Sequence, residues 1–289
     1  MQYNIKREWL NLTLDKDTTL KDFFDFYHIS KKNRYLMMQN EEIYLNHLPL
    51  KNENESLLNG QQLRLKVFKK EAIDFKPQNL FPLHVLYEDP FCIIVDKPAG
   101  YIVHDEENSL ANVVSYYYQQ HKINTPIRYI HRLDKETSGL VFFCKCPFFQ
   151  PYFDDLLNKK QIERKYMARV EGLIDWKQHT CKLPIGKDRH NNNKYIVHKN
   201  GKEAITHFER LDYYDECQTI VLCTLETGRP HQIRVHLSSL GYPIVNDAIY
   251  GEVTSNEDMA LCAYELTWPH PITQELHTCQ LDDEVIIEE

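Results

Sequence analysis

The chain has 289 residues, 42% of them hydrophobic and 26% charged, a composition that excludes a disordered or collagen-like protein. It contains no apolar run near the ~18 residues of a membrane-spanning helix and no secretory signal at its N-terminus, so we expect a cytoplasmic protein with no membrane partner. The formal net charge of −8 argues against non-specific nucleic-acid binding, but five acids stand in the last eight residues, and the nearly neutral remainder can still carry a local basic groove.

Residues 1–75 are predicted to form a small α+β module. Apolar residues at i, i+3, i+4 and i+7 from Leu20 to Tyr27 predict a helix, with Thr19 as its N-cap. A second short helix is expected after Ser30, and the segments EEIYLNH and QQLRLKVF have the character of strands. Two short helices and a small sheet would make a compact unit.

The first turn of the second predicted helix is basic, with Lys31, Lys32 and Arg34. Basic side chains early in a helix oppose its dipole, which favours a role outside the helix, such as a phosphate contact. A solvated helix face is the alternative interpretation.

Residues 76–83 contain two prolines and no periodicity, and we interpret them as a linker to a second domain at 84–289. Strands are predicted there in FCIIV, SGLVFFCK, ERKYMARVEGL, AITHFERL and QTIVLCTLET, and helices in PFFQPYFDDLLNKKQ and RPHQIRVHLSSL. Pro230 suits the first position of the second helix. Because no regular β-α-β rhythm occurs, we expect an α+β fold with a mixed, largely antiparallel sheet and flanking helices.

No cofactor or metal site is predicted. The chain lacks a dinucleotide fingerprint and a phosphate-binding loop, and its 14 histidines match no common zinc spacing. None of its eight cysteines forms a C-x-x-C pair, so we interpret them as reduced thiols, several of them in apolar runs.

A dense polar cluster, HRLDKETSGL, stands at residues 131–140 directly before an apolar strand. Such a position lets side chains project into a cleft. Asp134 is flanked by Arg132 and Lys135, which favour its ionised form. A turn held by an ion pair between aspartate and arginine is the alternative.

A second polar segment, ETGRPHQIRVHL, stands at residues 226–237 where a helix is expected to begin. It combines two arginines, two histidines and a glutamine, which is too polar for a core. The alternative is an exposed helix face.

Together these two segments, the second continuing through SSLGYPIVNDAIYG, resemble the catalytic motifs of the RluA-type family of RNA pseudouridine synthases. The segment VDKPAG at 95–100, followed by His104, resembles a third family motif, and ERKYMA at 163–168 resembles the strand that carries the active-site tyrosine. Residues 1–75 resemble an S4-like RNA-binding domain. Departures are Asn246 for glycine and Pro230 for threonine, and the S4-like part has Asn46-His47 in place of an asparagine-glycine turn.

The resemblance implies isomerisation of uridine to pseudouridine, with Asp134 as catalytic carboxylate, Arg234 as its salt-bridge partner and Tyr166 stacked on the target base. The chemical role of Asp134 stays open among attack at C1′, attack at C6 and assistance to a glycal route. The implied substrate-binding residues are Arg132, His131, Lys97, Arg229, His231 and Gln232, with Lys31, Lys32 and Arg34 as RNA-binding residues of the N-terminal module.

We expect a monomer that acts on structured RNA, large-subunit ribosomal RNA rather than transfer RNA, because of the S4-like module. The alternatives are a transfer-RNA enzyme and a non-catalytic RNA-binding protein that retains the fold. A basic face is expected to extend through Lys159, Lys160 and Arg164, and the linker to let the N-terminal module move as a separate unit.

Overall fold

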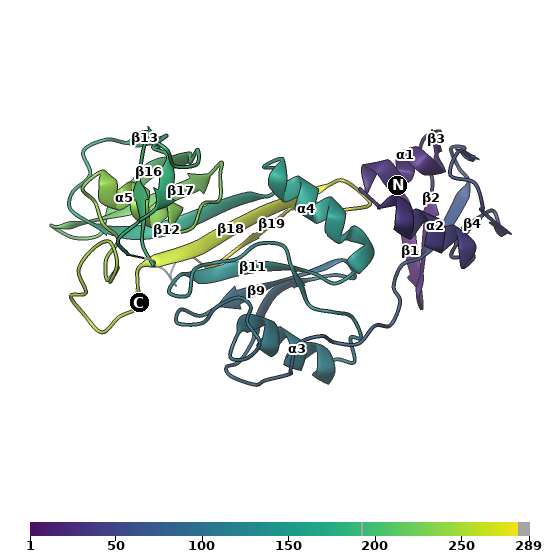
Figure 1. The fold of residues 1–289 in the computed structure, drawn as a ribbon, viewed down its shortest axis with the longest axis horizontal. Coiled ribbons are helices and arrows are strands. Elements are labelled where there is room, and N and C mark those ends of the chain that lie inside the picture. Colours follow the sequence, from purple (N-terminus) through teal and green to yellow (C-terminus); the bar gives the residue numbers. More distant parts are fainter. Residues whose placement is uncertain (192, 283–289) are drawn as a thin grey trace.

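The computed structural model describes residues 1–191 and 193–282. The N-terminal module stands at one end of the molecule, beyond helix α4, and the rest of the chain forms a larger domain around a long sheet (Figure 1). Within the described residues, no helix is both long enough and apolar enough to cross a membrane.

The N-terminal module is a five-stranded antiparallel sheet covered by two helices. Its strands lie in the order β1 (Gln2–Lys6), β2 (Trp9–Thr13), β7 (Gln62–Lys66), β4 (Ile43–Leu45) and β5 (Leu48–Pro49). A separate pair joins β3 (Thr18–Thr19) to β6 (Ser56–Leu57), and the helices are α1 (Leu20–Phe26) and α2 (Lys31–Gln39).

The local signals for the first helix are confirmed. The Asp22 amide donates to Thr19 Oγ1 at 3.0 Å, so Thr19 is the N-cap. The predicted apolar face is buried, with Leu20, Phe24 and Tyr27 all fully inaccessible. Burial of these side chains in one cluster stabilises a helix that is too short to persist alone.

Arg34, which we expected at an RNA-binding surface, is a structural residue instead. Its guanidinium forms an ion pair with Asp25, lies 3.6 Å from Glu53 and donates from Nε to the Ile29 carbonyl at 2.7 Å. Because these contacts leave the side chain only 9% exposed, it links helix α2 to its neighbours rather than facing RNA. Lys31 and Lys32 are exposed.

The larger domain is built on one long sheet, and the prediction of a mixed, largely antiparallel α+β fold is confirmed. The strands lie in the order β13 (Gln178–Cys181), β16 (Thr206–Tyr213), β17 (Gln218–Leu225), β12 (Glu163–Glu171), β18 (Leu261–Pro269), β11 (Ser138–Cys144), β9 (Cys92–Lys97) and β8 (His84–Glu88). Two further strands flank it, β10 (Arg128–Tyr129) on β11 and β19 (Leu276–Gln280) on β18. Strands β11 and β18 are parallel, and the other pairings in this sheet are antiparallel.

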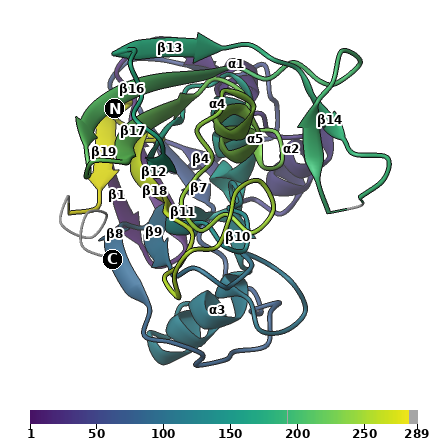
Figure 2. The same ribbon diagram turned by 90° about the vertical axis from the view of Figure 1, so that its left-hand side faces the viewer.

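Helices cover both faces of this sheet because its side chains alternate between two apolar cores. Ile94 and Phe142 belong to the core shared with α4 (Gln150–Asn158) and the N-terminal module, whereas Ile93 and Val141 belong to the core shared with α3 (Leu110–Gln120) and α5 (Gln232–Ser239). Figure 2 shows α3 and α5 at separate places on the domain. A short hairpin, β14 (Ile185–Lys187) and β15 (Tyr195–Val197), packs near α5, and a 3₁₀ turn, η1 (Pro147–Phe149), precedes α4.

The N-terminal module packs closely on the larger domain. The Tyr27 hydroxyl donates to the Pro271 carbonyl at 2.8 Å, and the Tyr27 ring lies edge-on to Phe149 at 5.2 Å. His28 Nε2 lies 3.1 Å from the Asp155 carboxylate on α4. These contacts, within a continuous apolar core, differ from the separately moving unit that we expected.

The segment between the two parts is also packed. The Phe75 and Lys76 carbonyls accept hydrogen bonds from Ser115 and Asn112 of α3, at 2.7 and 2.9 Å. The Gln78 amide donates back to the Asn112 carbonyl at 3.0 Å. The segment is therefore anchored along α3, which limits independent movement of the module.

Candidate active site

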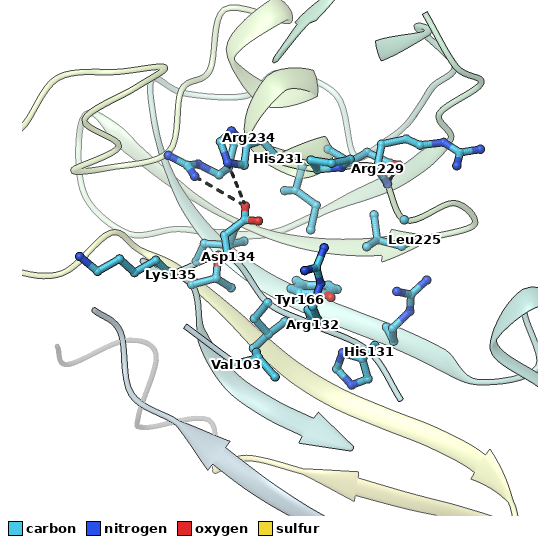
Figure 3. A pocket seen from close by; sticks show the side chains of 18 of the residues that line it. Val103, His131, Arg132, Asp134, Lys135, Tyr166, Leu225, Arg229, His231 and Arg234 are labelled. Atoms are coloured by element: carbon cyan, nitrogen blue, oxygen red, sulfur yellow. Dashed lines mark hydrogen bonds and ion pairs between the residues drawn. The ribbon is translucent and has the colours of Figure 1, made fainter. Parts of the chain in front are cut away.

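An open cleft of about 550 Å³ lies on the face of the sheet that α3 and α5 cover. Residues 102–104 line it together with three longer segments: the loop between β10 and β11, strand β12, and the connection from β17 to α5. The three longer segments correspond to three of the sequence motifs. Figure 3 shows Asp134 and Arg234 facing one another, with Tyr166 on the same side.

The loop that carries Asp134 is stabilised by hydrogen bonds from the VDKPAG segment. The Lys135 carbonyl accepts hydrogen bonds from Lys97 Nζ at 3.0 Å and from the Gly100 amide at 2.9 Å. Lys97 Nζ also donates to the carbonyls of Pro98 and Tyr101. Lys97 is fully buried, and burial lowers its pKa to about 8. It therefore supports the loop, which corrects our expectation that it binds substrate.

Gly139 fixes the other end of the same loop. Its φ is +102°, and a Cβ atom there would lie 2.3 Å from the Ala263 carbonyl oxygen of the parallel strand β18. A side chain at this position would push β11 and β18 apart. Glycine thus allows the close strand approach directly after the Asp134 loop.

Arg234 joins the Asp134 loop to α5. Its Nη1 lies 3.6 Å from Asp134 Oδ2, while its Nε and Nη2 donate to the two oxygens of Asp247 at 2.7 and 2.8 Å. The side chain of Asp247 is fully buried. Burial alone would raise the pKa of Asp247, but the Arg234 guanidinium and the amides of Ile249 and Tyr250 hold it below its usual value. Asp247 is a site residue that we did not predict, although it lies in the continuation of the C-terminal motif.

His231 is the second polar neighbour of Asp134. Its Nε2 lies 3.9 Å from Asp134 Oδ2, and its Nδ1 lies 2.8 Å from the Tyr250 hydroxyl. Burial, opposed by Asp134 and assisted by Arg234, lowers the pKa of His231, so the imidazole is neutral at pH 7. The Tyr195 amide donates to the Tyr250 hydroxyl. We therefore assign the hydroxyl as the donor to His231 Nδ1, which places the imidazole proton on Nε2, facing Asp134.

The helix begins later than the sequence suggested. His231, with a φ of 55°, is the N-cap residue, so Pro230 precedes the helix rather than opening it. A left-handed conformation is uncommon for a residue with a side chain and concentrates at functional sites. Here it brings the imidazole to Asp134.

Tyr166 supplies an aromatic surface in the cleft. It is 5% exposed and stands on β12 beside a register shift that separates Lys165 and Tyr166 in their pairing with β18. Burial raises the pKa of Tyr166, so its phenol is neutral. A neutral ring can lie against a planar base.

Three arginines line the cleft without a carboxylate partner among the described residues: Arg132, Arg164 and Arg229. Arg132 Nη1 lies 3.2 Å from His104 Nε2, and Arg229 Nε donates to the Glu203 carbonyl at 2.8 Å. Within residues 1–191 and 193–282, their positive charges are therefore not neutralised by an ion pair.

Other expected RNA contacts are already engaged within the protein. Lys159 lies 2.7 Å from Asp155, and Lys160 lies 3.1 Å from Glu226. Both lysines remain about half exposed.

Gln232, a predicted substrate-binding residue, stabilises the lining of the cleft through hydrogen bonds within the protein. Its amide oxygen accepts from Thr227 Oγ1 and the Arg229 amide, while its nitrogen donates to Ile205 and Thr206. Since all its hydrogen-bonding capacity is used, Gln232 fixes the start of α5 rather than binding substrate.

His131, another predicted substrate-binding residue, is equally buried. Its Nε2 accepts from the Phe142 amide at 3.3 Å. Burial and the nearby Arg164 lower the pKa of His131 to about 3. It is therefore a neutral structural residue, in keeping with a role in ordering the loop.

Comparison with known proteins identifies the family. Residues 92–239 match the family model described as RNA pseudouridylate synthase. The chain belongs to the RNA pseudouridylate synthase family. It is thus an isomerase that acts on RNA, and the RluA-type membership predicted from its motifs is confirmed.

Relatives extend beyond the matched segment. An uncharacterized RNA pseudouridine synthase of Bacillus subtilis, YhcT, is 36% identical over 245 residues, which cover 81% of each chain. The ribosomal large subunit pseudouridine synthase D of Escherichia coli is 30% identical over 239 residues, which cover 81% of this chain and 72% of the relative. The solved structure of human RNA pseudouridylate synthase domain containing 1 shares the fold, with a TM-score of 0.62 and 24% identity over 73% of this chain and 87% of the human chain.

Proposed function

We propose that this enzyme converts uridine to pseudouridine in structured large-subunit ribosomal RNA, with Asp134 as the catalytic carboxylate. The observation that carries the proposal is the position of Asp134 in an open cleft, 3.6 Å from Arg234 and on the same side as Tyr166 (Figure 3). Relatives that are 30% and 32% identical, from Escherichia coli and Buchnera aphidicola, are named ribosomal large subunit pseudouridine synthase D, which favours ribosomal RNA as the substrate.

The reaction requires one well-placed carboxylate. The N1–C1′ bond breaks, a C5–C1′ bond forms, C5 loses a proton and N1 gains one, so the product is an isomer and no electrons are transferred overall. An ionised Asp134 can act as nucleophile or stabilise positive charge on the sugar. The Arg234 guanidinium lies 3.6 Å from Asp134, and its anchoring by Asp247 keeps it in place while the charge on Asp134 changes.

Tyr166 is proposed to stack on the target base. The base must leave the RNA stack, turn and bond again through another atom, and a stacking contact tolerates that rotation. The ring needs no hydrogen bond to a particular edge of the base. We therefore propose that Tyr166 holds the base while it is detached from the sugar.

RNA affinity is proposed to come from positive charge that the protein leaves unpaired. Arg132, Arg164 and Arg229 line the cleft and have no ion-pair partner among the described residues, so each can bind a phosphate without first breaking a salt bridge. We also propose that residues 1–75 are an S4-like module, and that exposed Lys31 and Lys32 add phosphate contacts.

Purified protein incubated with transcripts of large-subunit ribosomal RNA and with transfer RNA tests this function. We expect pseudouridine at a defined position in the ribosomal RNA. Modification of transfer RNA alone would refute the proposed substrate, and binding without pseudouridine in either RNA would favour a non-catalytic RNA-binding protein.

A further inference from the structure

The partner of Arg132 differs from those of the four arginines that form ion pairs among the described residues. Arg34, Arg128, Arg169 and Arg234 form ion pairs with carboxylates. Arg132 contacts a histidine instead, with its Nη1 3.2 Å from His104 Nε2. An imidazole nitrogen can accept a hydrogen bond from a guanidinium when the ring is neutral. Arg132 is thus oriented by a group that does not cancel its charge.

His104 is itself held in place by an aromatic neighbour. Its ring is stacked on Tyr129, with centroids 4.6 Å apart and an interplanar angle of 24°. Both rings line the same cleft as Arg132 and Tyr166. The stacking fixes the plane of the imidazole, and the plane fixes the direction from which Nε2 can accept a hydrogen bond.

The segment from Lys97 to His104 therefore supports the Asp134 loop at two points. Its beginning binds the Lys135 carbonyl through Lys97 and Gly100. Its end reaches the cleft and meets the Arg132 side chain. The first contact holds the backbone next to Asp134, and the second orients a cation two residues before Asp134.

We propose that His104 is a positioning residue for Arg132, and that it aims this guanidinium at the RNA backbone beside the target uridine. The inference rests on the proposed function. A guanidinium has five N–H donors, and the contact with His104 uses one of them, so the remaining donors and the whole charge stay available for a phosphate. A carboxylate in the place of His104 would orient Arg132 equally well but would neutralise it.

Two substitutions separate the hydrogen bond from the stacking. His104→Phe keeps an aromatic ring for Tyr129 and removes the acceptor. We expect it to raise KM and the dissociation constant for a ribosomal RNA transcript about tenfold, with kcat little changed, because one hydrogen bond to a charged group is removed. His104→Gln restores an acceptor at a similar distance from the backbone, and we expect affinity within about threefold of the original protein.

The matched control is His121→Phe. His121 is also stacked on a tyrosine, Tyr117, with centroids 3.9 Å apart, but it lies at the end of α3, outside the cleft lining, and its ring nitrogen contacts a carbonyl rather than an arginine. Replacement of His121 should leave KM and the dissociation constant for the RNA transcript unchanged. Thermal melting of all three variants shows whether each one folds.

A double-mutant comparison decides whether His104 acts through Arg132. In an Arg132→Ala background, His104→Phe should have no further effect on RNA binding. An undiminished effect in that background, equal defects in the Phe and Gln variants, or no effect of His104→Phe would each overturn the inference. Absence of pseudouridine formation by the unaltered protein would instead refute the proposed function, while the binding comparison would still test His104.

Discussion

Asp247 holds Arg234 by both of its carboxylate oxygens, at 2.7 and 2.8 Å, and both side chains are almost completely buried. This pairing occupies two of the three guanidinium nitrogens and leaves Nη1 directed at the cleft. The side chain that faces Asp134 is therefore fixed in position before any RNA binds.

Asp247→Asn is expected to impair both stability and activity. Removing one partner of a buried ion pair leaves Arg234 poorly compensated, so the free energy of unfolding should fall by about 3 kcal/mol. A displaced Nη1 should lower kcat about 100-fold. Denaturant titration and single-turnover assays measure the two effects. Glu107→Gln is the control, since Glu107 pairs with Lys76 at an exposed site. We expect this variant to lose less than about 1 kcal/mol in free energy of unfolding. Equal stability losses in the two variants would contradict this account.

Arg234→Lys is expected to be poorly tolerated although it conserves charge. An ammonium cannot make two parallel contacts with Asp247 and still reach Asp134. We expect kcat to fall about 100-fold, measured in single-turnover reactions. Arg128→Lys, at an ion pair with Asp74 outside the cleft lining, serves as the comparison. Near-normal turnover by the Arg234 variant would show that the bidentate anchor is dispensable.

The pKa of His131 predicts part of the loss of stability in acid. Its pKa is lowered from 6.5 to about 3 by burial and by Arg164, so below pH 6.5 the unfolded chain takes up a proton that the folded protein refuses. Stability must therefore decrease as the pH falls from 6.5 towards 3, by at most about 1.4 kcal/mol per pH unit from this group. In denaturant titrations between pH 6 and pH 4, His131→Gln should reduce the slope of the free energy of unfolding against pH, by at most the contribution of one proton. His190→Gln, at an exposed position, serves as the comparison.

The N-terminal lysines are expected to contribute to RNA affinity through charge. Replacing both Lys31 and Lys32 with Gln should weaken binding and reduce the slope of log affinity against log salt by about one unit for each phosphate that the variant no longer binds. Lys51→Gln, whose lysine pairs with Glu41 in the same module, is the control. An unchanged salt slope in the double variant would show that this helix does not contact RNA.

The sequence predicted those elements whose signals are local. Thr19 and the apolar spacing from Leu20 to Tyr27 specify a helix without reference to the rest of the chain. The hairpin β1–β2 was missed because Arg7, with a φ of 57°, occupies a turn position that usually has glycine or asparagine. Helix α3 was missed because residues 110–120 are rich in valine and tyrosine, which favour strands, and packing against the sheet overrides that preference.

The site residues that lie within the sequence motifs could be predicted, whereas their contacts with distant segments could not. The Asp134, Tyr166 and Arg234 motifs do converge on one cleft. The structural use of Lys97 and Gln232 could not be predicted, because burial and carbonyl contacts depend on segments distant in sequence. The anchoring of Arg234 by Asp247 depends on the chain returning to α5 after the helix ends, which no spacing rule describes.

The most direct test of the account is pseudouridine formation by purified Asp134→Asn protein under single-turnover conditions with saturating ribosomal RNA. Asparagine keeps the shape of the side chain and removes its charge, so the fold and the RNA affinity should remain. The account predicts no detectable pseudouridine with RNA binding within about threefold of the original protein. Measurable formation of pseudouridine by the pure variant would contradict the assignment of Asp134 as the catalytic carboxylate.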